Sequence, residues 1–193
     1  MKEDLNDHVL YVGKALRDAQ SFFPRLRDEI EWQTIIWGKT KRPLPRLCST
    51  NIPNTEIGLF VLSWVVSYFK ANFDTNVKIH GVFGNYYRNG DDYLPQHRDQ
   101  YDDHHVISLS FGATRSFGFK NSTYYALGDG DLIVFDPYMN KHYTHGIGKQ
   151  KKVQEGRINF TIFATFDKAP YGKKSKGALS SLNEFIAEAS SHF

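Results

Sequence analysis

The spacing of apolar residues predicts helices in the first part of the chain. Between residues 4 and 23, apolar side chains recur near helical spacing and Pro24 follows them, so we expect a packing helix that ends there. A broader apolar stretch runs from Glu56 to about Asn72, with Thr55 in the N-cap position. Because apolar residues surround most of this second helix, we expect it to be buried against a sheet.

The pattern changes to period two from Asn76 onward, with β-branched and aromatic residues between Gly- and Asp-rich turns. One earlier strand is expected at Glu31–Trp37. Seven later strands are expected, at Val77–Tyr87, Val106–Phe111, Arg115–Phe119, Tyr124–Leu127, Asp131–Phe135, His142–Ile147 and Gly156–Phe166. Many short strands with such turns favour a sandwich or jelly roll. We therefore expect an α+β fold, a double-stranded β-helix sandwich with supporting N-terminal helices.

The length of 193 residues suits one domain with a single core. Residues 1–75 would support the core, residues 76–167 would form it, and residues 168–193 would be a basic linker with a short helix. A capping box at Ser181 and Glu184 marks the start of that helix.

Composition places few limits on function. The net charge is +3, so a polyanionic partner is permitted but not required. The single Cys48 rules out an intramolecular disulfide and fits a reducing compartment. No apolar run approaches the roughly 20 residues that span a bilayer. We expect a soluble intracellular monomer, cytoplasmic or nuclear, with no membrane association.

The candidate chemistry begins at His97 and Asp99. Two residues two positions apart in an extended segment point to the same face, so an imidazole and a carboxylate can bind one metal ion. His145 is the candidate third ligand, in a later strand. Two His and one carboxylate form the facial triad of non-haem Fe(II) oxygenases. A zinc hydrolase with the same three ligands remains an alternative.

A basic residue distinguishes these alternatives. Arg157 lies 12 residues after His145 and begins a predicted strand in which positions 157, 159 and 161 are polar and share one face. A guanidinium can hold a carboxylate bidentately while the other end of the same small molecule chelates iron. A zinc hydrolase gives this arginine no evident role. Serine hydrolysis has no support, because no G-x-S-x-G motif is present.

The ordered set of motifs resembles that of the AlkB-like Fe(II)/2-oxoglutarate dioxygenases, from about Trp32 to Phe166. The motifs are N-x-Y-x-x-G at Asn85, Tyr87 and Gly90, the H-x-D motif, Ser108–Gly112, a Gly-Asp-Leu strand, His145, and R-x-N-x-T from Arg157. The resemblance implies that His97, Asp99 and His145 are the metal ligands and catalytic centre. It also implies that Arg157, Asn85 and Tyr87 bind 2-oxoglutarate, with Asn159 beside them.

Fe(II), 2-oxoglutarate as co-substrate and dioxygen are the expected cofactors. The implied reaction is oxidative demethylation of N-alkylated bases in DNA or RNA, a repair activity.

Two positions depart from the pattern of the nucleic-acid dealkylases in that family. Phe163 stands where they usually have a second Arg, and Tyr101 where they have an acidic residue. These departures support an alternative enzyme, a 2-oxoglutarate-dependent hydroxylase of a protein side chain or small metabolite. A binding module with a vestigial metal site is a third reading, which the intact motif residues oppose.

The basic segment Gly38–Arg46 is expected to be a loop. In the resembling family such a segment carries a lid over the substrate; the alternative is a solvated connection with Trp37 in the core. The candidate substrate contacts are Trp37, Arg46, Tyr93 and Tyr101, because aromatic faces stack on bases. Arg115 either reaches the pocket or bonds surface carbonyls.

Overall fold

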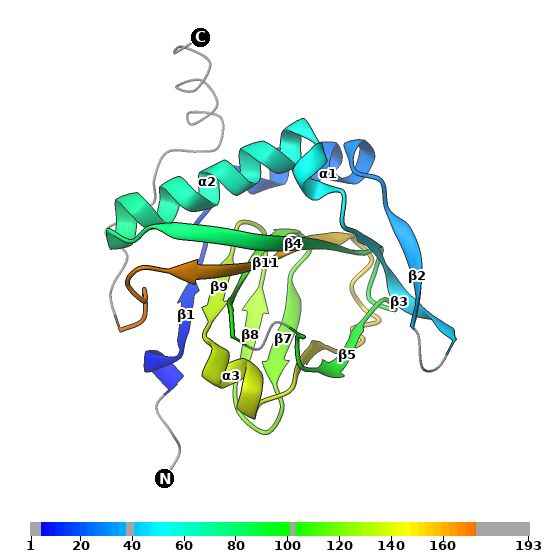
Figure 1. Ribbon diagram of the computed structural model, residues 1–193. Helices are drawn as coiled ribbons and strands as arrows, with labels where there is room; N and C mark the ends of the chain where they lie inside the picture. The colour runs from blue at the N-terminus through cyan, green and yellow to red at the C-terminus, as the bar shows by residue number, and fades with distance from the viewer. Residues whose placement is uncertain (1–4, 38–40, 101–102, 173–193) are drawn as a thin grey trace.

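Two antiparallel sheets face each other in the computed structural model, which describes residues 5–37, 41–100 and 103–172 (Figure 1). In spatial order, the large sheet consists of β1 (Val9–Val12), β9 (Leu132–Phe135), β6 (His105–Gly112), β11 (Arg157–Phe166), β4 (Val77–Tyr87), β3 (Arg42–Ser49) and β2 (Gln33–Trp37). The small sheet consists of β5 (Leu94–His97), β10 (His145–Ile147), β7 (Arg115–Phe119) and β8 (Tyr124–Leu127). The predicted sandwich is confirmed.

The long helix α2 (Glu56–Phe73) covers the outer face of the large sheet (Figure 1). The Thr55 hydroxyl caps it by accepting a hydrogen bond from the Gly58 N–H at 3.1 Å. Buried side chains of α2 pack against even-numbered positions of β11, including Ile158 and Phe160. The odd-numbered positions of β11 therefore face the small sheet, as the alternation predicted.

The inner face of the large sheet is organised by β11, which pairs with both β4 and β6. Arg157 lies opposite Tyr87, and Asn159 lies opposite Asn85. This register brings two sequence motifs that lie about 70 residues apart into adjacent cross-strand pairs. The polar floor of the space between the sheets follows from this pairing.

The predicted helix over residues 4–23 is wrong. A short 3-10 turn, η1 (Leu5–Asp7), leads into β1, which pairs with β9 along the edge of the large sheet. Lys14 and Asp18 have positive φ, so the backbone leaves the helical region between β1 and the next 3-10 turn, η2 (Ala19–Ser21). Pro24 does not end a helix but occupies the first turn of α1 (Phe23–Glu29), where a missing N–H costs nothing.

The predicted loop Gly38–Arg46 is also wrong in its second half, which is the start of β3. Pro43 lies opposite Ile36 of β2, but β3 pairs with β4 only from Leu47 onward, so both prolines are tolerated where the β4 side of the strand is unpaired. After β3, the 3-10 turn η3 (Ile52–Asn54) leads into α2. Residues 38–40 lie outside the described residues.

The predicted strand His142–Ile147 is a strand only in its second half, because His142 ends a helix and Tyr143 and Thr144 connect the two. Asp136 caps α3 (Pro137–His142) by accepting from the Met139 N–H at 2.9 Å, and Pro137 fills the first turn. Only His145–Ile147 forms a strand. His142 is the last residue of α3, and its ring lies 4.3 Å from that of Tyr138.

Arg115 is fully buried and serves the fold. Its guanidinium donates to the carbonyl oxygens of Asn89, Asp92 and Gly148 and to the Gln150 side chain, at 2.8 to 3.1 Å. It thus ties together the loops that flank β5 and β10, bonding carbonyls in the interior rather than at the surface.

The candidate helix at Ser181 and Glu184 lies outside the described residues. None of the helices in the described residues is long and apolar enough to cross a membrane.

Candidate metal centre and co-substrate pocket

A pocket of about 310 Å³ lies between the two sheets. Its floor consists of polar residues from the inner face of the large sheet, and its walls include aromatic and aliphatic side chains from both sheets. The residues that line it are Arg46, Phe83, Asn85, Tyr87, Leu94, His97, Arg98, Asp99, Gln100, Val106, Ser108, Phe117, Phe135, His145, Ile147, Arg157, Asn159, Thr161 and Phe163. All seven residues predicted for the metal and 2-oxoglutarate meet in this one cavity.

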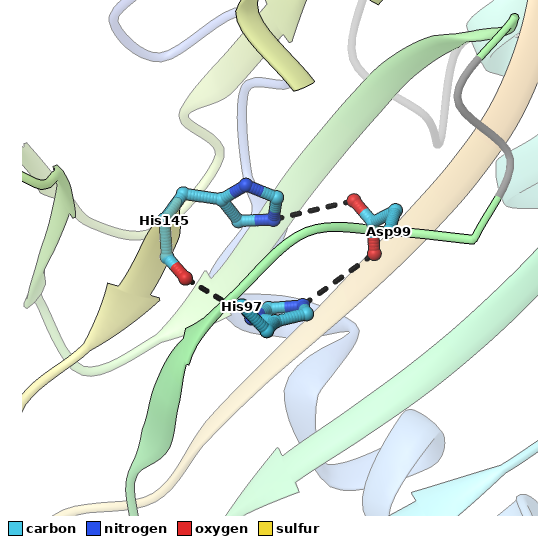
Figure 2. A group of neighbouring side chains, drawn as sticks. All are labelled: His97, Asp99 and His145. Carbon is cyan, nitrogen blue, oxygen red and sulfur yellow. Dashed lines mark hydrogen bonds and ion pairs between the residues drawn. The ribbon is translucent and has the colours of Figure 1, made fainter. Parts of the chain in front are cut away.

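His97, Asp99 and His145 converge at the small-sheet wall (Figure 2). His145 on β10 lies directly opposite His97 on β5, and this pairing places the two rings side by side. The Asp99 carboxylate lies between them, with Oδ1 3.5 Å from His97 Nε2 and Oδ2 3.2 Å from His145 Nε2. One ligand atom from each residue lies within 4.8 Å of the others.

The hydrogen bonds of His97 fix which ring nitrogen is free. Its Nδ1 lies 3.0 Å from the carbonyl oxygens of both Pro95 and His145. Because carbonyl oxygens only accept, Nδ1 must carry the proton, and the lone pair of the neutral ring is on Nε2. Nε2 faces Asp99, which is the orientation that a metal ligand requires.

The charge state of the cluster suits a cation. Burial opposes ionisation of Asp99, yet the neighbouring His145 and His97 outweigh it and hold the pKa of this carboxyl well below its usual range. Burial lowers the pKa of His145, against the attraction of Asp99, so its imidazole stays neutral at pH 7. Two imidazole nitrogens and one carboxylate are the donor set of mononuclear non-haem iron sites, so the residues fit Fe(II).

Asn140 on α3 holds Asp99 in place and was not singled out from the sequence. Its Oδ1 accepts from the Asp99 N–H at 2.9 Å, and its Nδ2 donates to the Asp99 carbonyl at 3.0 Å. Asp99 lies beyond the end of β5, so this two-way amide contact does what a strand ladder would otherwise do. An Asn in a short helix carries no sequence signal for such a role.

Arg157 lies at the opposite end of the polar floor and is fully buried. It donates to Ser110 Oγ at 2.8 Å and to Asn159 Oδ1 at 3.2 Å, and its guanidinium lies 5.4 Å from the Tyr87 ring centroid. Its Nε has no hydrogen-bond partner among the described residues. Burial lowers its pKa to about 10, so it remains a cation at neutral pH and needs an anion.

Asn85 and Asn159 connect the two ends of the floor. Asn159 Nδ2 donates to Thr161 Oγ1 at 3.0 Å and to Ser108 Oγ at 3.2 Å. Asn85 Oδ1 accepts from Arg46 Nε at 2.6 Å. The floor is therefore a row of polar side chains that hold one another in place by hydrogen bonds.

The four predicted substrate contacts have different outcomes. Arg46 lines the pocket and is buried, although the sequence placed it in an exposed loop. Tyr93 lies outside the pocket lining, with the Lys149 ammonium 5.2 Å from its ring centroid. Tyr101 and the Trp37 side chain lie outside the described residues, although the Trp37 backbone ends β2.

The sequence profile of the 2OG-Fe(II) oxygenase superfamily matches residues 13–162. The chain belongs to the 2OG-Fe(II) oxygenase superfamily. It is therefore an oxidoreductase whose cofactors are Fe(II), 2-oxoglutarate and dioxygen.

The chain is 26% identical over 193 aligned residues to the DNA oxidative demethylase ALKBH2 of Bos taurus. The alignment covers 83% of this chain and 69% of that relative. The AlkB-like resemblance within the superfamily is thus confirmed.

Solved 2OG-Fe(II) oxygenase structures share the fold. HygX from Streptomyces hygroscopicus, solved with nickel, 2-oxoglutarate and hygromycin B bound, has a TM-score of 0.60 at 10% identity, covering 94% of this chain and 96% of HygX. A 2OG-Fe(II) oxygenase family oxidoreductase from Burkholderia pseudomallei has a TM-score of 0.57 at 13% identity, covering 83% of this chain and 87% of that protein. The jelly-roll prediction is confirmed.

Proposed function

We propose that His97, Asp99 and His145 hold the Fe(II) of this oxygenase and that Arg157, Tyr87, Asn85 and Asn159 hold 2-oxoglutarate. The observation that carries the proposal is the pocket itself, which holds the buried Arg157 cation and the His97, Asp99 and His145 cluster at opposite ends of one polar floor. When bound, Fe(II) supplies the activation of dioxygen that couples loss of CO2 from 2-oxoglutarate to hydroxylation of a C–H bond.

Each group on the chain has a definite part in this reaction. Arg157 pairs with the distal carboxylate, because it is a buried cation in the pocket lining and its Nε has no hydrogen-bond partner among the described residues. Asn140 holds the Asp99 backbone, and the carbonyls of Pro95 and His145 hold the His97 ring. The apolar walls exclude water from the reacting groups.

We further propose that the prime substrate is an N-methylated base in DNA or RNA. Hydroxylation of the N-methyl carbon gives a hydroxymethyl group that leaves as formaldehyde and restores the N–H. The likeness to the DNA oxidative demethylase ALKBH2 over 83% of the chain supports this substrate class. The exposed rim residues Arg98 and Gln100 mark where a flipped or unpaired base would enter.

The β2–β3 hairpin supplies the cations that a nucleic-acid backbone requires. Lys41 and Arg42 are exposed at its start, on the same strand that carries Arg46 into the pocket. Lys149 is also exposed and lies against Tyr93, whose backbone N–H bonds the Pro45 carbonyl of β3. Exposed cations thus lie on the hairpin and on the loop after β10.

Replacing both Lys41 and Arg42 with Gln is expected to weaken binding of a methylated single-stranded oligonucleotide and to flatten its salt dependence. The slope of log affinity against log salt is negative, and loss of two phosphate contacts reduces its magnitude by up to about 1.4. Fluorescence anisotropy over a series of salt concentrations measures both quantities. Turnover of 2-oxoglutarate without prime substrate is expected to stay near the wild-type rate.

The matched control removes two exposed lysines beside Asp74, at the end of α2. The variant Lys70→Gln/Lys168→Gln has the same charge change and is expected to retain the wild-type slope. Equal losses in both variants would mean that net charge alone drives binding. A salt-independent interaction in the wild-type protein would favour a hydroxylase of a protein side chain or metabolite, the alternative that Phe163 supports.

A further inference from the structure

Arg46 is a second buried guanidinium in the pocket, and it comes from β3 rather than from β11. Its side chain is only 6% exposed and lines the cavity. Nε donates to Asn85 Oδ1 at 2.6 Å, whereas the buried Nη1 has no hydrogen-bond partner among the described residues. Because Arg46 is a buried cation in the lining of a cavity and one of its donor nitrogens has no partner among the described residues, it calls for an anionic or strongly accepting ligand.

The strand register shows which end of the pocket holds the triad. The Phe135 ring centroid lies 5.0 Å from that of His145. Phe135 pairs with Val106, and Val106 pairs with Phe163, so the triad lies over the Phe163 end of β11. Arg157 lies six residues away, about 20 Å along the strand. The distal carboxylate site and the metal site thus occupy different cross-strand rows.

Arg46 reaches toward the metal end of this axis. The pairing of Leu47 with Tyr86 places Arg46 beside Tyr87 and therefore in the same row as Arg157. Its hydrogen bond to Asn85 directs the guanidinium into the next row, where Asn85 faces Asn159. That row lies two residues from Arg157 and four from Phe163 along β11, so the Arg46 guanidinium is displaced from the Arg157 row in the direction of the triad.

The β11 strand offers no cation near the triad. Phe163, which occupies that row, is apolar and lines the pocket, and the other lining arginine, Arg98, is exposed. A 2-oxo dicarboxylate brings one carboxylate to each end of the pocket. Arg157 meets one, and a carboxylate at the metal end would have only neutral amides and hydroxyls along β11.

We propose that Arg46 provides this missing contact by donating from Nη1 to the carboxylate at the 2-oxo end of the co-substrate. The inference rests on the proposed function, since it takes the bound molecule to be 2-oxoglutarate. The hydrogen bond from Arg46 to Asn85 also orients the Asn85 side chain. Because Asn85 Oδ1 accepts from Arg46, the Asn85 amide keeps its Nδ2 donor directed toward Thr161 on the pocket floor.

Two ligands separate the roles of the two arginines. 2-Oxoglutarate carries both carboxylates, whereas 2-oxopentanoate has the same chain length and 2-oxo acid end but a methyl group in place of the distal carboxylate. Calorimetric titration of each ligand into the anaerobic Fe(II) protein measures binding without turnover. Arg46→Met is expected to weaken the binding of both ligands by the same factor, at least about tenfold. Arg157→Met is expected to weaken the binding of 2-oxoglutarate only. The preference of the protein for 2-oxoglutarate over 2-oxopentanoate is then lost.

A relocated guanidinium provides the positive test. Adding Phe163→Arg to Arg46→Met places a cation on β11 in the metal row and is expected to recover a substantial part of the lost affinity for both ligands. Arg25→Met, an exposed residue on α1, is the matched control and is expected to bind both ligands as the wild type does.

The outcomes distinguish this inference from the proposed function. If the wild-type protein bound no 2-oxoglutarate in the presence of Fe(II), the proposed function would fail. If Arg157→Met weakened 2-oxoglutarate but Arg46→Met bound both ligands normally, only the role of Arg46 would be overturned. A loss confined to 2-oxoglutarate in Arg46→Met would also overturn it, since Arg46 would then share the distal carboxylate.

Discussion

Replacing Asp99 or His145 with Ala is expected to lower Fe(II) affinity by more than about 100-fold and to abolish turnover. Each change removes one of the three proposed protein ligands, and loss of a group that merely orients a ligand already costs about 10- to 100-fold in metal affinity. Anaerobic Fe(II) titration by calorimetry measures the affinity, and 2-oxoglutarate consumption measures turnover. Asp99→Ala also removes the only carboxylate of the triad and with it the local negative charge.

His142→Ala is the matched control for the imidazole ligands. His142 is exposed on α3, three residues before His145, and its ring lies against Tyr138. This variant is expected to retain wild-type iron affinity and turnover. If His145→Ala instead behaved like His142→Ala, the third ligand would have to come from another residue.

Replacing Arg157 with Met is expected to raise the KM for 2-oxoglutarate by at least about tenfold. The change removes charge-assisted hydrogen bonds worth roughly 1.5 to 3 kcal/mol each, while it preserves most of the side-chain volume. Steady-state kinetics at saturating iron and oxygen measure the effect. Arg157→Lys keeps the charge but not the planar fork, so an intermediate KM is expected.

Arg115 is a buried arginine that stabilises the fold and does not line the pocket, so it provides a comparison for Arg157. Because its donors bond three backbone carbonyls and Gln150, Arg115→Met is expected to lower the melting temperature while the surviving folded protein keeps its KM for 2-oxoglutarate. If the KM stayed unchanged in Arg157→Met, the distal carboxylate would have to lie elsewhere in the pocket. Arg46 would then be the remaining buried guanidinium in the lining.

The residues of the pocket floor could be predicted from the sequence because alternation along a strand is a local property. The polar positions from Arg157 to Thr161 share a face whether or not the partner strand is known. His97 and His145 could be nominated from residue type and order. That they would lie directly opposite each other on adjacent strands is a long-range fact, and only the pairing of β5 with β10 supplies it.

The errors have equally specific causes. The apolar residues from Val9 to Val12 are too few to separate helix from strand, and pairing with β9 decides the matter. Pro43 and Pro45 suggest a loop unless one knows that β3 pairs with β4 only after them. The contacts of Asn140 with Asp99 join residues 41 positions apart, so neither composition nor spacing could indicate them.

Formaldehyde release from methylated oligonucleotides tests the central claim most directly. The wild-type protein, with Fe(II), 2-oxoglutarate and oxygen, is incubated with a panel of single-stranded DNA and RNA oligonucleotides that carry different N-methylated bases and with unmethylated copies of the same sequences. We predict formaldehyde equimolar with succinate above the uncoupled background, from methylated members of the panel only, and none from the Asp99→Ala variant. Sustained 2-oxoglutarate turnover with no formaldehyde from any methylated member would contradict the demethylase assignment and favour a protein or metabolite substrate.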